Sequence, residues 1–383
     1  MRGQSHLIVV LLVAVSAAAA VLRWVPAFGG PLTEAVRKCK QAQDAYEKGQ
    51  VQEAIKLYTE AIEINPQYAE AYYRRAQLYK ELKQWDKKAA DISSTLAVDP
   101  KHVGALRDRA GDFFYKGKYL DAELDYSAAI KINRHNWYDY YMRGRCRAAQ
   151  GHDEAAMKDF DSAIEENTKA SDAYYERGKL YVRQGKQKRA EKDFNRAIEY
   201  SWKHAGAHVE LGKFRLAEKD YDEALKLFTK AERLSYGQGG EQLFWRGNTY
   251  KALKDYARAV EDYSAAIGRK FDTPQLRYNR AAAYYELGEL EKARADLRLA
   301  VKGDEKNKQY AWALGRVEQL LAKKQAAEEA RRKAEEARRK AEEEARRKAE
   351  EEAAEEAEEA EEPESGEDEG EGEGDDDEFV NPL

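Results

Sequence analysis

The chain has 383 residues, of which 36% are charged and only seven are proline, a composition that suits helices better than sheets. The formal net charge of −6 conceals a split, because residues 327–383 contain 26 acidic and 9 basic residues. This acidic end has a net charge of −17, and its difference from the total of −6 leaves +11 for residues 1–326. The sequence therefore predicts a basic helical body with an acidic end.

Residues 1–31 have the features of an export segment. A short positive start precedes sixteen uncharged residues, 7–22, and Ala18 and Ala20 fit a small-x-small cleavage pattern. Two alternatives stay open. The segment could be an uncleaved membrane anchor, although it is short for a bilayer core of about 30 Å, or a helix that packs on the repeats. We expect export to a periplasm, an endoplasmic-reticulum lumen or the exterior of the cell. The exported protein would be soluble after cleavage or membrane-anchored, and residues 24–31 would form a linker.

A unit of 34 residues recurs eight times between Ala35 and Asn307, with one step of 35. Each copy has a first small residue: Ala42, Ala76, Ala110, Gly144, Gly178, Gly212, Gly247 and Ala281. Two more small residues follow twelve and nineteen positions later, except in the second copy, which has Lys88 and Thr95 there. A bulky residue stands between them: Tyr58, Ile92, Tyr126, Phe160, Phe194, Phe228, Tyr263 and Leu297. This pattern predicts paired helices that bury their apolar faces only by stacking on further copies.

The unit resembles the tetratricopeptide repeat (TPR). Pro66 and Pro100 close copies in the manner of that family, and Ala69-Glu-Ala-Tyr-Tyr73 and Ser171-Asp-Ala-Tyr-Tyr175 open them. The resemblance implies an all-α solenoid of helical hairpins over residues 35–307, a right-handed superhelix whose first helices line a concave groove. It also implies protein binding, but neither a reaction nor a particular ligand.

Three further segments follow the repeats. Tyr310, Leu314, Val317 and Leu321 form one apolar stripe and predict a capping helix over residues 308–325. Residues 326–362 repeat AEEARRK with Glu placed four residues before Arg or Lys, which predicts a charged single α-helix. Residues 363–383 are predicted to be a disordered acidic tail. The tail ends in a hydrophobic motif: Phe379, Val380, Asn381, Pro382 and Leu383.

The tail has three possible roles. We expect an outward arm that displays residues 379–383 as a docking motif, similar in outline to the acidic tails of bacterial single-strand-binding proteins. A merely solubilising tail is the first alternative. The second is a tail that folds back on the basic groove, which the long charged helix opposes because it carries the tail away from the repeats.

Six of the eight copies contain an arginine and an aspartate sixteen residues apart, and the other two copies lack both. This recurrence predicts an ion pair between the two helices of each such copy, a structural feature rather than a catalytic one. The predicted pairs are Arg75–Asp91, Arg109–Asp125, Arg143–Asp159, Arg177–Asp193, Arg246–Asp262 and Arg280–Asp296.

Candidate partner-binding residues lie on the first helices. An aromatic row, which either faces the groove or fills the helix packing, contains Tyr73, Tyr138, Tyr141, Tyr175, Phe244 and Tyr278. Trp245 follows an occupied aromatic position and is the best single candidate for an exposed anchor. Arg145, Lys179 and Lys213 occupy equivalent places and would form a basic ladder, which Glu176 and Glu210 could neutralise.

Other site chemistries find little support. Cys39 and Cys146 lie in distant copies and are expected to pack as small apolar residues. His204 and His208 have helical metal-ligand spacing but no third ligand, so we expect neither metal nor cofactor. No catalytic motif occurs. The export segment and the acidic tail argue against a nucleic-acid partner. We also expect no Hsp70 or Hsp90 peptide as a partner, because the positions of the carboxylate clamp that holds such peptides contain Cys39, Gln43, Arg74, Gly104 and Asp108, which do not match it.

These observations favour a non-enzymatic, exported TPR scaffold or adaptor that binds a peptide or protein in its groove. One alternative is a lumenal or periplasmic co-chaperone of client chains. The other is an accessory subunit of a membrane enzyme or a secretion complex.

Overall fold

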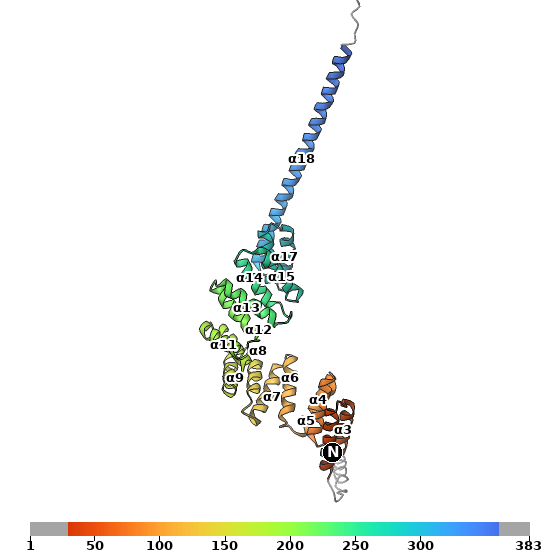
Figure 1. Ribbon diagram of the computed structural model, residues 1–383, viewed down its shortest axis with the longest axis vertical. Helices are drawn as coiled ribbons and strands as arrows, with labels where there is room; N and C mark the ends of the chain where they lie inside the picture. Colours follow the sequence, from red (N-terminus) through yellow and green to blue (C-terminus); the bar gives the residue numbers. More distant parts are fainter. Residues whose placement is uncertain (1–29, 360–383) are drawn as a thin grey trace, which may run out of the picture. The chain divides into compact units, whose positions relative to one another are not determined.

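The computed structural model describes residues 30–359, which form seventeen α-helices and no strand (Figure 1). The all-α prediction is therefore confirmed for this part of the chain. The export segment and the acidic tail with its terminal motif lie outside the described residues. Two compact units are present, one comprising the chain up to Leu253 with Ala265–Phe271, the other Lys254–Ser264 and the chain from Asp272. Each unit is described by itself.

Every predicted repeat forms a pair of helices. The first helices are α2 (Pro31–Glu47), α4 (Ala69–Glu81), α6 (Val103–Tyr115), α8 (Trp137–Ala149), α10 (Ser171–Arg183), α12 (Ala205–Ala217), α14 (Glu241–Ala252) and α16 (Pro274–Glu286). The second helices are α3 (Val51–Ile64), α5 (Trp85–Val98), α7 (Tyr119–Ile132), α9 (Asp153–Glu166), α11 (Gln187–Tyr200), α13 (Tyr221–Leu234), α15 (Tyr256–Gly268) and α17 (Leu290–Gly303). The eight-repeat prediction is confirmed.

Small and bulky residues meet inside each repeat as the sequence predicts. Phe194 is fully buried, and a Cβ added to Gly178 would lie 2.6 Å from its Cε1 atom. Gly144 and Gly212 approach Phe160 and Phe228 equally closely. The close approach leaves no room for a methyl group, so these three repeats require glycine where others have alanine.

The turn between the two helices of a repeat needs a left-handed residue. Gly185 occupies that place with φ +70°, a conformation that costs glycine little. The equivalent place holds lysine in three repeats, with φ of 57° at Lys83, 64° at Lys219 and 62° at Lys254. Those three lysines pay a steric penalty that glycine avoids.

The second repeat accommodates its two unusual residues by polar contacts. Lys88 is only 3% exposed, and its Nζ lies 2.7 Å from both carboxylate oxygens of Asp112 on α6. Thr95 is fully buried and donates a hydrogen bond to the carbonyl of Asp91 over 2.8 Å. A buried ammonium group needs such a partner, so the substitution of the small residue by lysine adds an ion pair between neighbouring repeats.

Five of the six predicted arginine–aspartate pairs form within their repeats. Their shortest nitrogen–oxygen distances are 2.7 Å for Arg75–Asp91, 2.8 Å for Arg109–Asp125, 2.7 Å for Arg143–Asp159, 2.8 Å for Arg177–Asp193 and 2.6 Å for Arg280–Asp296. Arg246 and Asp262 belong to different units, so their pairing stays a prediction.

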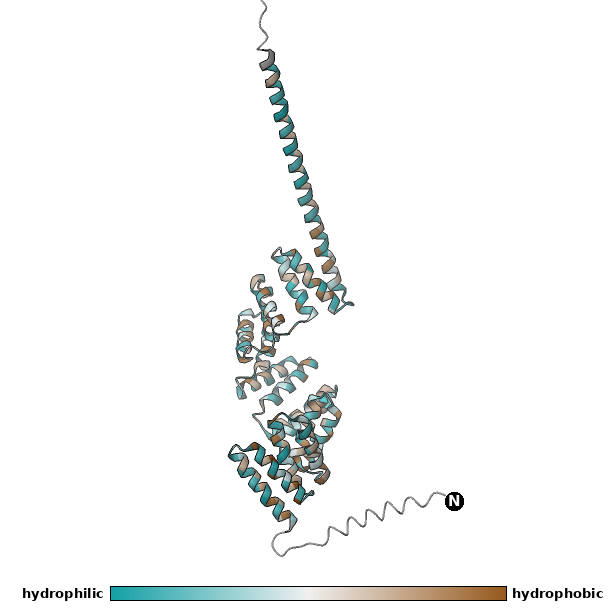
Figure 2. Cartoon of the chain, turned by 90° about the vertical axis from the view of Figure 1, so that its right-hand side faces the viewer, coloured by the Kyte–Doolittle hydropathy of each residue, from teal (hydrophilic) through white to brown (hydrophobic). Residues whose placement is uncertain are grey.

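The capping and charged segments form one helix, α18 (Lys308–Glu359), of 52 residues. Tyr310, Val317 and Leu321 are buried, as the predicted apolar stripe requires. Beyond them α18 consists of charged residues and alanines apart from Gln325, and hydrophilic and weakly hydrophobic residues alternate along it (Figure 2). Ion pairs four residues apart support it, including Glu336–Lys340 at 3.2 Å and Arg346–Glu350 at 2.7 Å. At 1.5 Å per residue its length is about 78 Å. Within residues 30–359, no helix has the length and apolarity that crossing a membrane requires.

Candidate functional site

The predicted basic residues lie on three consecutive first helices. Arg145 is on α8, Lys179 on α10 and Lys213 on α12, and carboxylates lie between them. Glu176 lies 4.0 Å from Arg145 Nε and 2.9 Å from Lys179 Nζ. The carboxylate of Glu176 therefore neutralises the basic residues locally, an alternative that the sequence left open.

The same alternation continues at Lys213. Its Nζ lies 2.8 Å from Glu210 and 2.8 Å from Glu241 on α14. Burial acts to lower the pKa of Lys213, but the hydrogen bonds to the two carboxylates outweigh it and raise the pKa. The row is therefore a polar surface of alternating sign, and Lys213 stays protonated at neutral pH.

A cavity of about 430 Å³ opens over this row. It is lined by residues of α8, α10 and α12: Arg145, Ala148, Ala149, Glu176, Lys179, Val182, Arg183 and Glu210. We call this surface the polar groove. Val182 and the two alanines are the apolar part of its lining, while the charged groups supply hydrogen-bond donors and acceptors. Such a mixture suits a peptide backbone better than a single compact ion.

Arg145 of the polar groove also lies against aromatic rings of α6 and α8, near which two tyrosines are exposed. Tyr138 is 43% exposed and Tyr115 is 87% exposed. The Arg145 guanidinium lies over the Phe114 ring at 4.6 Å. Burial raises the pKa of Tyr138, and the neighbouring Tyr115 contributes to the shift. The sequence did not predict Tyr115 as a candidate, because its position at the end of a first helix does not recur as an aromatic residue in other repeats.

Two predicted groove aromatics prove to be core residues. Tyr141 is 8% exposed and Phe244 is 7% exposed. Their burial favours the packing alternative for both, and their contact with a partner stays a prediction. Phe244 packs on Phe271 with 5.7 Å between ring centroids, which accounts for its burial.

Tyr73 and Tyr175 are half-buried at the boundary with the following repeat. Tyr175 packs on His204, with ring centroids 4.5 Å apart, and covers Gly206 so closely that a Cβ there would clash. Tyr73 covers Gly104 in the same way. These two tyrosines join repeats, which limits what they offer a partner.

Trp245 is half-buried and less exposed than predicted. It packs against the cluster around Phe228, and Lys213 Nζ lies 5.2 Å from its ring centroid. Its Nε1 donates to Glu241 Oε1 over 3.4 Å. Trp245 therefore ends the alternating row on α14, and its role as an anchor stays a prediction.

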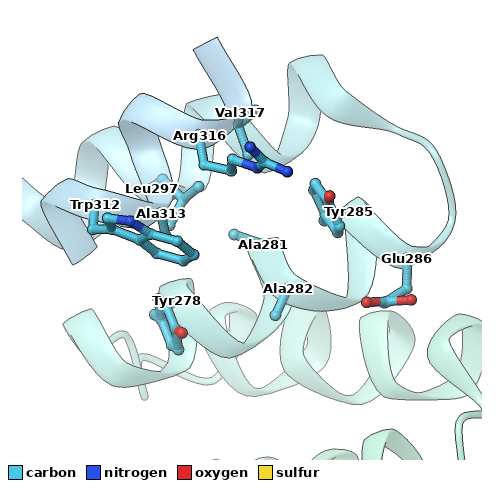
Figure 3. A pocket seen from close by; sticks show the side chains of 10 residues that line it. All are labelled: Tyr278, Ala281, Ala282, Tyr285, Glu286, Leu297, Trp312, Ala313, Arg316 and Val317. Carbon is cyan, nitrogen blue, oxygen red and sulfur yellow. The ribbon is translucent and has the colours of Figure 1, made fainter. Parts of the chain in front are cut away.

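Tyr278 belongs to a separate cavity in the second unit. This cavity of about 340 Å³ lies between α16 and α18, and its lining includes Tyr285, Trp312 and Arg316 (Figure 3). Trp312 is 72% exposed. Trp312 lies outside the apolar stripe of the capping segment, so its position in the sequence gave no sign of a site.

Cys39, Cys146, His204 and His208 have structural roles. Burial raises the pKa of Cys39 to about 11 and that of Cys146 to about 12, so both thiols are unreactive at neutral pH. His204 accepts a hydrogen bond from the Ala207 amide over 3.1 Å, and its Nε2 lies 3.3 Å from Asp172. His208 is buried, which lowers its pKa, and its Nε2 lies 3.1 Å from the Trp202 carbonyl. Among the described residues no group of side chains could hold a metal ion.

Comparisons with known proteins agree with this architecture. A family model described as a TPR repeat matches residues 42–83, and one described as a tetratricopeptide repeat matches residues 175–238 and 246–310. Human serine/threonine-protein phosphatase 5 is 29% identical over 111 residues, which cover 29% of this chain and 22% of the phosphatase. The chain thus matches about a fifth of that relative's length.

Two solved structures share the fold. The crystal structure of the APC/C hetero-tetramer Cut9-Hcn1 aligns with a TM-score of 0.56 at 14% identity, covering 72% of this chain and 54% of that one. PilF of Pseudomonas aeruginosa aligns with a TM-score of 0.50 at 12% identity, covering 55% of this chain and 95% of that one. The matched repeats and the stacked helix pairs show that this chain is a tetratricopeptide repeat protein, a scaffold suited to binding proteins or peptides.

Proposed function

We propose that the protein is a non-enzymatic adaptor that holds an extended protein segment in the polar groove. One observation carries the proposal: three successive first helices present alternating cations and carboxylates around an open cavity of about 430 Å³. The arginine–aspartate pairs that join the two helices of a repeat, such as Arg177–Asp193, lie between first and second helices. The charged row on the first helices is therefore not needed to hold a hairpin together.

The expected ligand has two features. Its backbone and polar side chains would exchange hydrogen bonds with Glu176, Lys179 and Glu210, which offer both donors and acceptors. A hydrophobic side chain beside that stretch would pack on Tyr138 and Tyr115, because exposed aromatic rings are efficient anchors. The partner is therefore a segment of mixed polarity with an aromatic or aliphatic anchor, not a polyanion.

Site-specific photo-crosslinking tests the location. A photoreactive amino acid at Val182, in the lining of the polar groove, should capture one partner from the native source. The matched control is the same amino acid at Leu124, which is 62% exposed on the second helix α7. Equal capture at both positions, or capture at Leu124 alone, would remove the polar groove as the binding site.

Charge reversal tests the chemistry of the groove. Lys179→Glu should weaken capture about tenfold or more by placing three carboxylates together. Lys192→Glu on α11 makes the same charge change on a second helix and should leave capture unchanged. The circular-dichroism spectra of both variants should match that of the parent protein.

Export is part of the proposal and is supported by the uncharged run 7–22 after a positive start. Fractionation of the native source with a protease-protection assay tests it. Protein found only on the cytoplasmic side would refute export while leaving the groove proposal intact. Capture of many unfolded chains would instead favour the co-chaperone alternative, and one stoichiometric complex the accessory-subunit alternative.

A further inference from the structure

The cavity in the second unit combines an apolar floor with aromatic sides. Its floor consists of the buried Ala281, Leu297 and Val317, and its sides include the rings of Tyr285 and Trp312 (Figure 3). Its volume of about 340 Å³ is in the usual range for ligand pockets, which is roughly 300–1,000 Å³. It accommodates a large apolar side chain.

Trp312 is the clearest sign that something covers this cavity. A helix that caps a solenoid normally presents a polar outer face. Here α18 buries Tyr310 and Val317 against the repeat but leaves the neighbouring Trp312 72% exposed. An exposed tryptophan beside an apolar cavity adds nothing to the cap, and it is typical of an interaction site.

We propose that this cavity receives the segment Phe379–Leu383 from a second copy of the chain. After Leu321 the sequence contains no valine, isoleucine, leucine, methionine or aromatic residue until Phe379, Val380 and Leu383. Apart from alanine and proline, these three are the apolar side chains of residues 322–383, and their phenyl and branched groups match the aromatic and aliphatic part of the lining. The apolar cavity and the apolar motif thus have complementary chemistry.

Charge favours the same pairing. Residues 364–378, which lead into the motif, contain ten acidic residues and no basic one. Residues 272–325, which surround the cavity, contain eleven Lys and Arg residues and eight Asp and Glu residues. The cavity lining itself carries one exposed charge of each sign, Arg316 and Glu286, so the positive excess lies in the residues around it. An approaching acidic segment is therefore attracted to this end of the protein, most strongly at low salt.

Geometry selects a second copy over the same chain. From Val317 to Glu359, 42 residues of α18 separate the cavity from the end of the helix, about 63 Å at 1.5 Å per residue. The 19 residues 360–378 span at most about 65 Å when fully extended. A chain could fill its own cavity only by extending this segment completely, which sacrifices nearly all its conformational freedom.

Two copies avoid that penalty. When two α18 helices run antiparallel, the end of each lies beside the cavity of the other. One two-fold axis then relates two identical contacts, so the assembly closes as a dimer. We expect a dimer of full-length chains in which each motif fills the partner's cavity.

Sedimentation velocity on the full-length protein tests the proposal, because self-association depends on concentration. The parent protein should be dimeric at about 50 µM. Two variants should be monomeric. Phe379→Ser with Leu383→Ser removes the apolar groups of the motif, and Ala282→Glu places a carboxylate in the cavity lining. Ala322→Glu adds the same charge to an exposed site on α18 outside the cavity lining and should stay dimeric.

Mixing the two monomeric variants makes the test specific. Differently tagged Ala282→Glu and Phe379→Ser/Leu383→Ser chains should associate with each other, because one contributes an intact motif and the other an intact cavity. A labelled peptide of residues 364–383 should bind the motif variant and bind the Ala282→Glu chain at least about tenfold more weakly. A monomeric parent protein, variants that remain dimeric, or variants that fail to associate would each overturn the proposal. None of these outcomes bears on the polar groove.

Discussion

Arg177 binds Asp193 of its own repeat and Asp161 of the preceding repeat, with a nitrogen–oxygen distance of 2.8 Å in each pair. A single guanidinium thus joins α9, α10 and α11. The equivalent arginines do the same with hydroxyl groups: Arg75 donates to Thr59 over 2.9 Å and Arg280 to Ser264 over 2.9 Å. The planar fork of arginine permits this double role, which lysine could not fill in the same geometry. The pairs therefore connect repeats as well as hairpins.

The two carboxylates held by Arg177 should differ in their contribution to stability. Asp193 is 4% exposed, whereas the Asp161 side chain is 47% exposed. Asp193→Ala should lower the free energy of unfolding by about 2–4 kcal/mol because it leaves the arginine without its buried partner. Asp161→Ala should cost less than about 1 kcal/mol. Urea unfolding measures both, and equal losses would contradict the assignment.

A double-mutant cycle separates the ion pair from the loss of packing. Arg177→Leu with Asp193→Ala should recover much of the stability that Asp193→Ala alone removes, since no buried charge is left unpaired. Additive effects of the two single changes would show that Arg177 and Asp193 do not interact energetically.

Gly178→Ala should destabilise the protein although alanine favours helices. The new Cβ would lie 2.6 Å from Phe194 Cε1, and overpacking of this kind costs about 1–3 kcal/mol. Gly111→Ala is the matched control, because its Cβ would approach nothing closer than the Tyr126 hydroxyl at 4.0 Å. That variant should gain roughly 0.5–1 kcal/mol from helix propensity. Thermal unfolding that ranks the two variants the other way would refute the steric argument.

Lys219→Gly should stabilise the sixth repeat. Lys219 has φ 64°, in the left-handed region where a side chain is strained. Removal of the side chain should gain about 0.5–1 kcal/mol after the entropy cost of glycine. Gly185→Lys makes the reverse change at the equivalent turn, where φ is +70°, and should lose a similar amount. A loss of stability for Lys219→Gly would mean that its side chain makes a favourable contact.

Two histidine–carboxylate contacts predict a loss of stability in acid. Hydrogen bonding to His102 holds the pKa of Glu70 below its ordinary value, and His204 does the same for Asp172. A carboxylate whose pKa is lower in the folded state binds fewer protons there than in the unfolded chain. Its stabilisation is therefore complete above the unfolded pKa of about 4 and disappears as the pH falls through the lower folded value.

The measurement is denaturant unfolding between about pH 6 and pH 3. The Glu70→Gln/Asp172→Asn double variant should lose less stability over this interval than the parent protein, because it lacks the two carboxylates. Parallel pH profiles for the two proteins would show that these contacts do not affect folding.

Local spacing in the sequence was sufficient for the repeat architecture. The recurring small and bulky residues predicted eight hairpins, and Arg143 with Asp159 could be paired because both recur at one fixed separation. Local spacing could not separate the buried Tyr141 and Phe244 from the half-buried Tyr73 and Tyr175, because all four stand three residues before the first small residue of their repeat. Exposure depends on neighbours such as Phe271, which lies 27 residues beyond Phe244 and carries no periodic signal.

The sequence by itself determined the secondary structure, the register of the repeats and the long charged helix. These features follow from interactions between residues that are close in the chain or repeated at a constant interval, so they appear as regular patterns in the sequence. Only the tertiary structure decided which charges are shared and where surfaces remain open. Glu176 bridges Arg145 and Lys179, Lys88 is buried beside Asp112, and Trp312 borders a cavity. Each outcome depends on how side chains from separate helices meet, which a one-dimensional pattern does not specify.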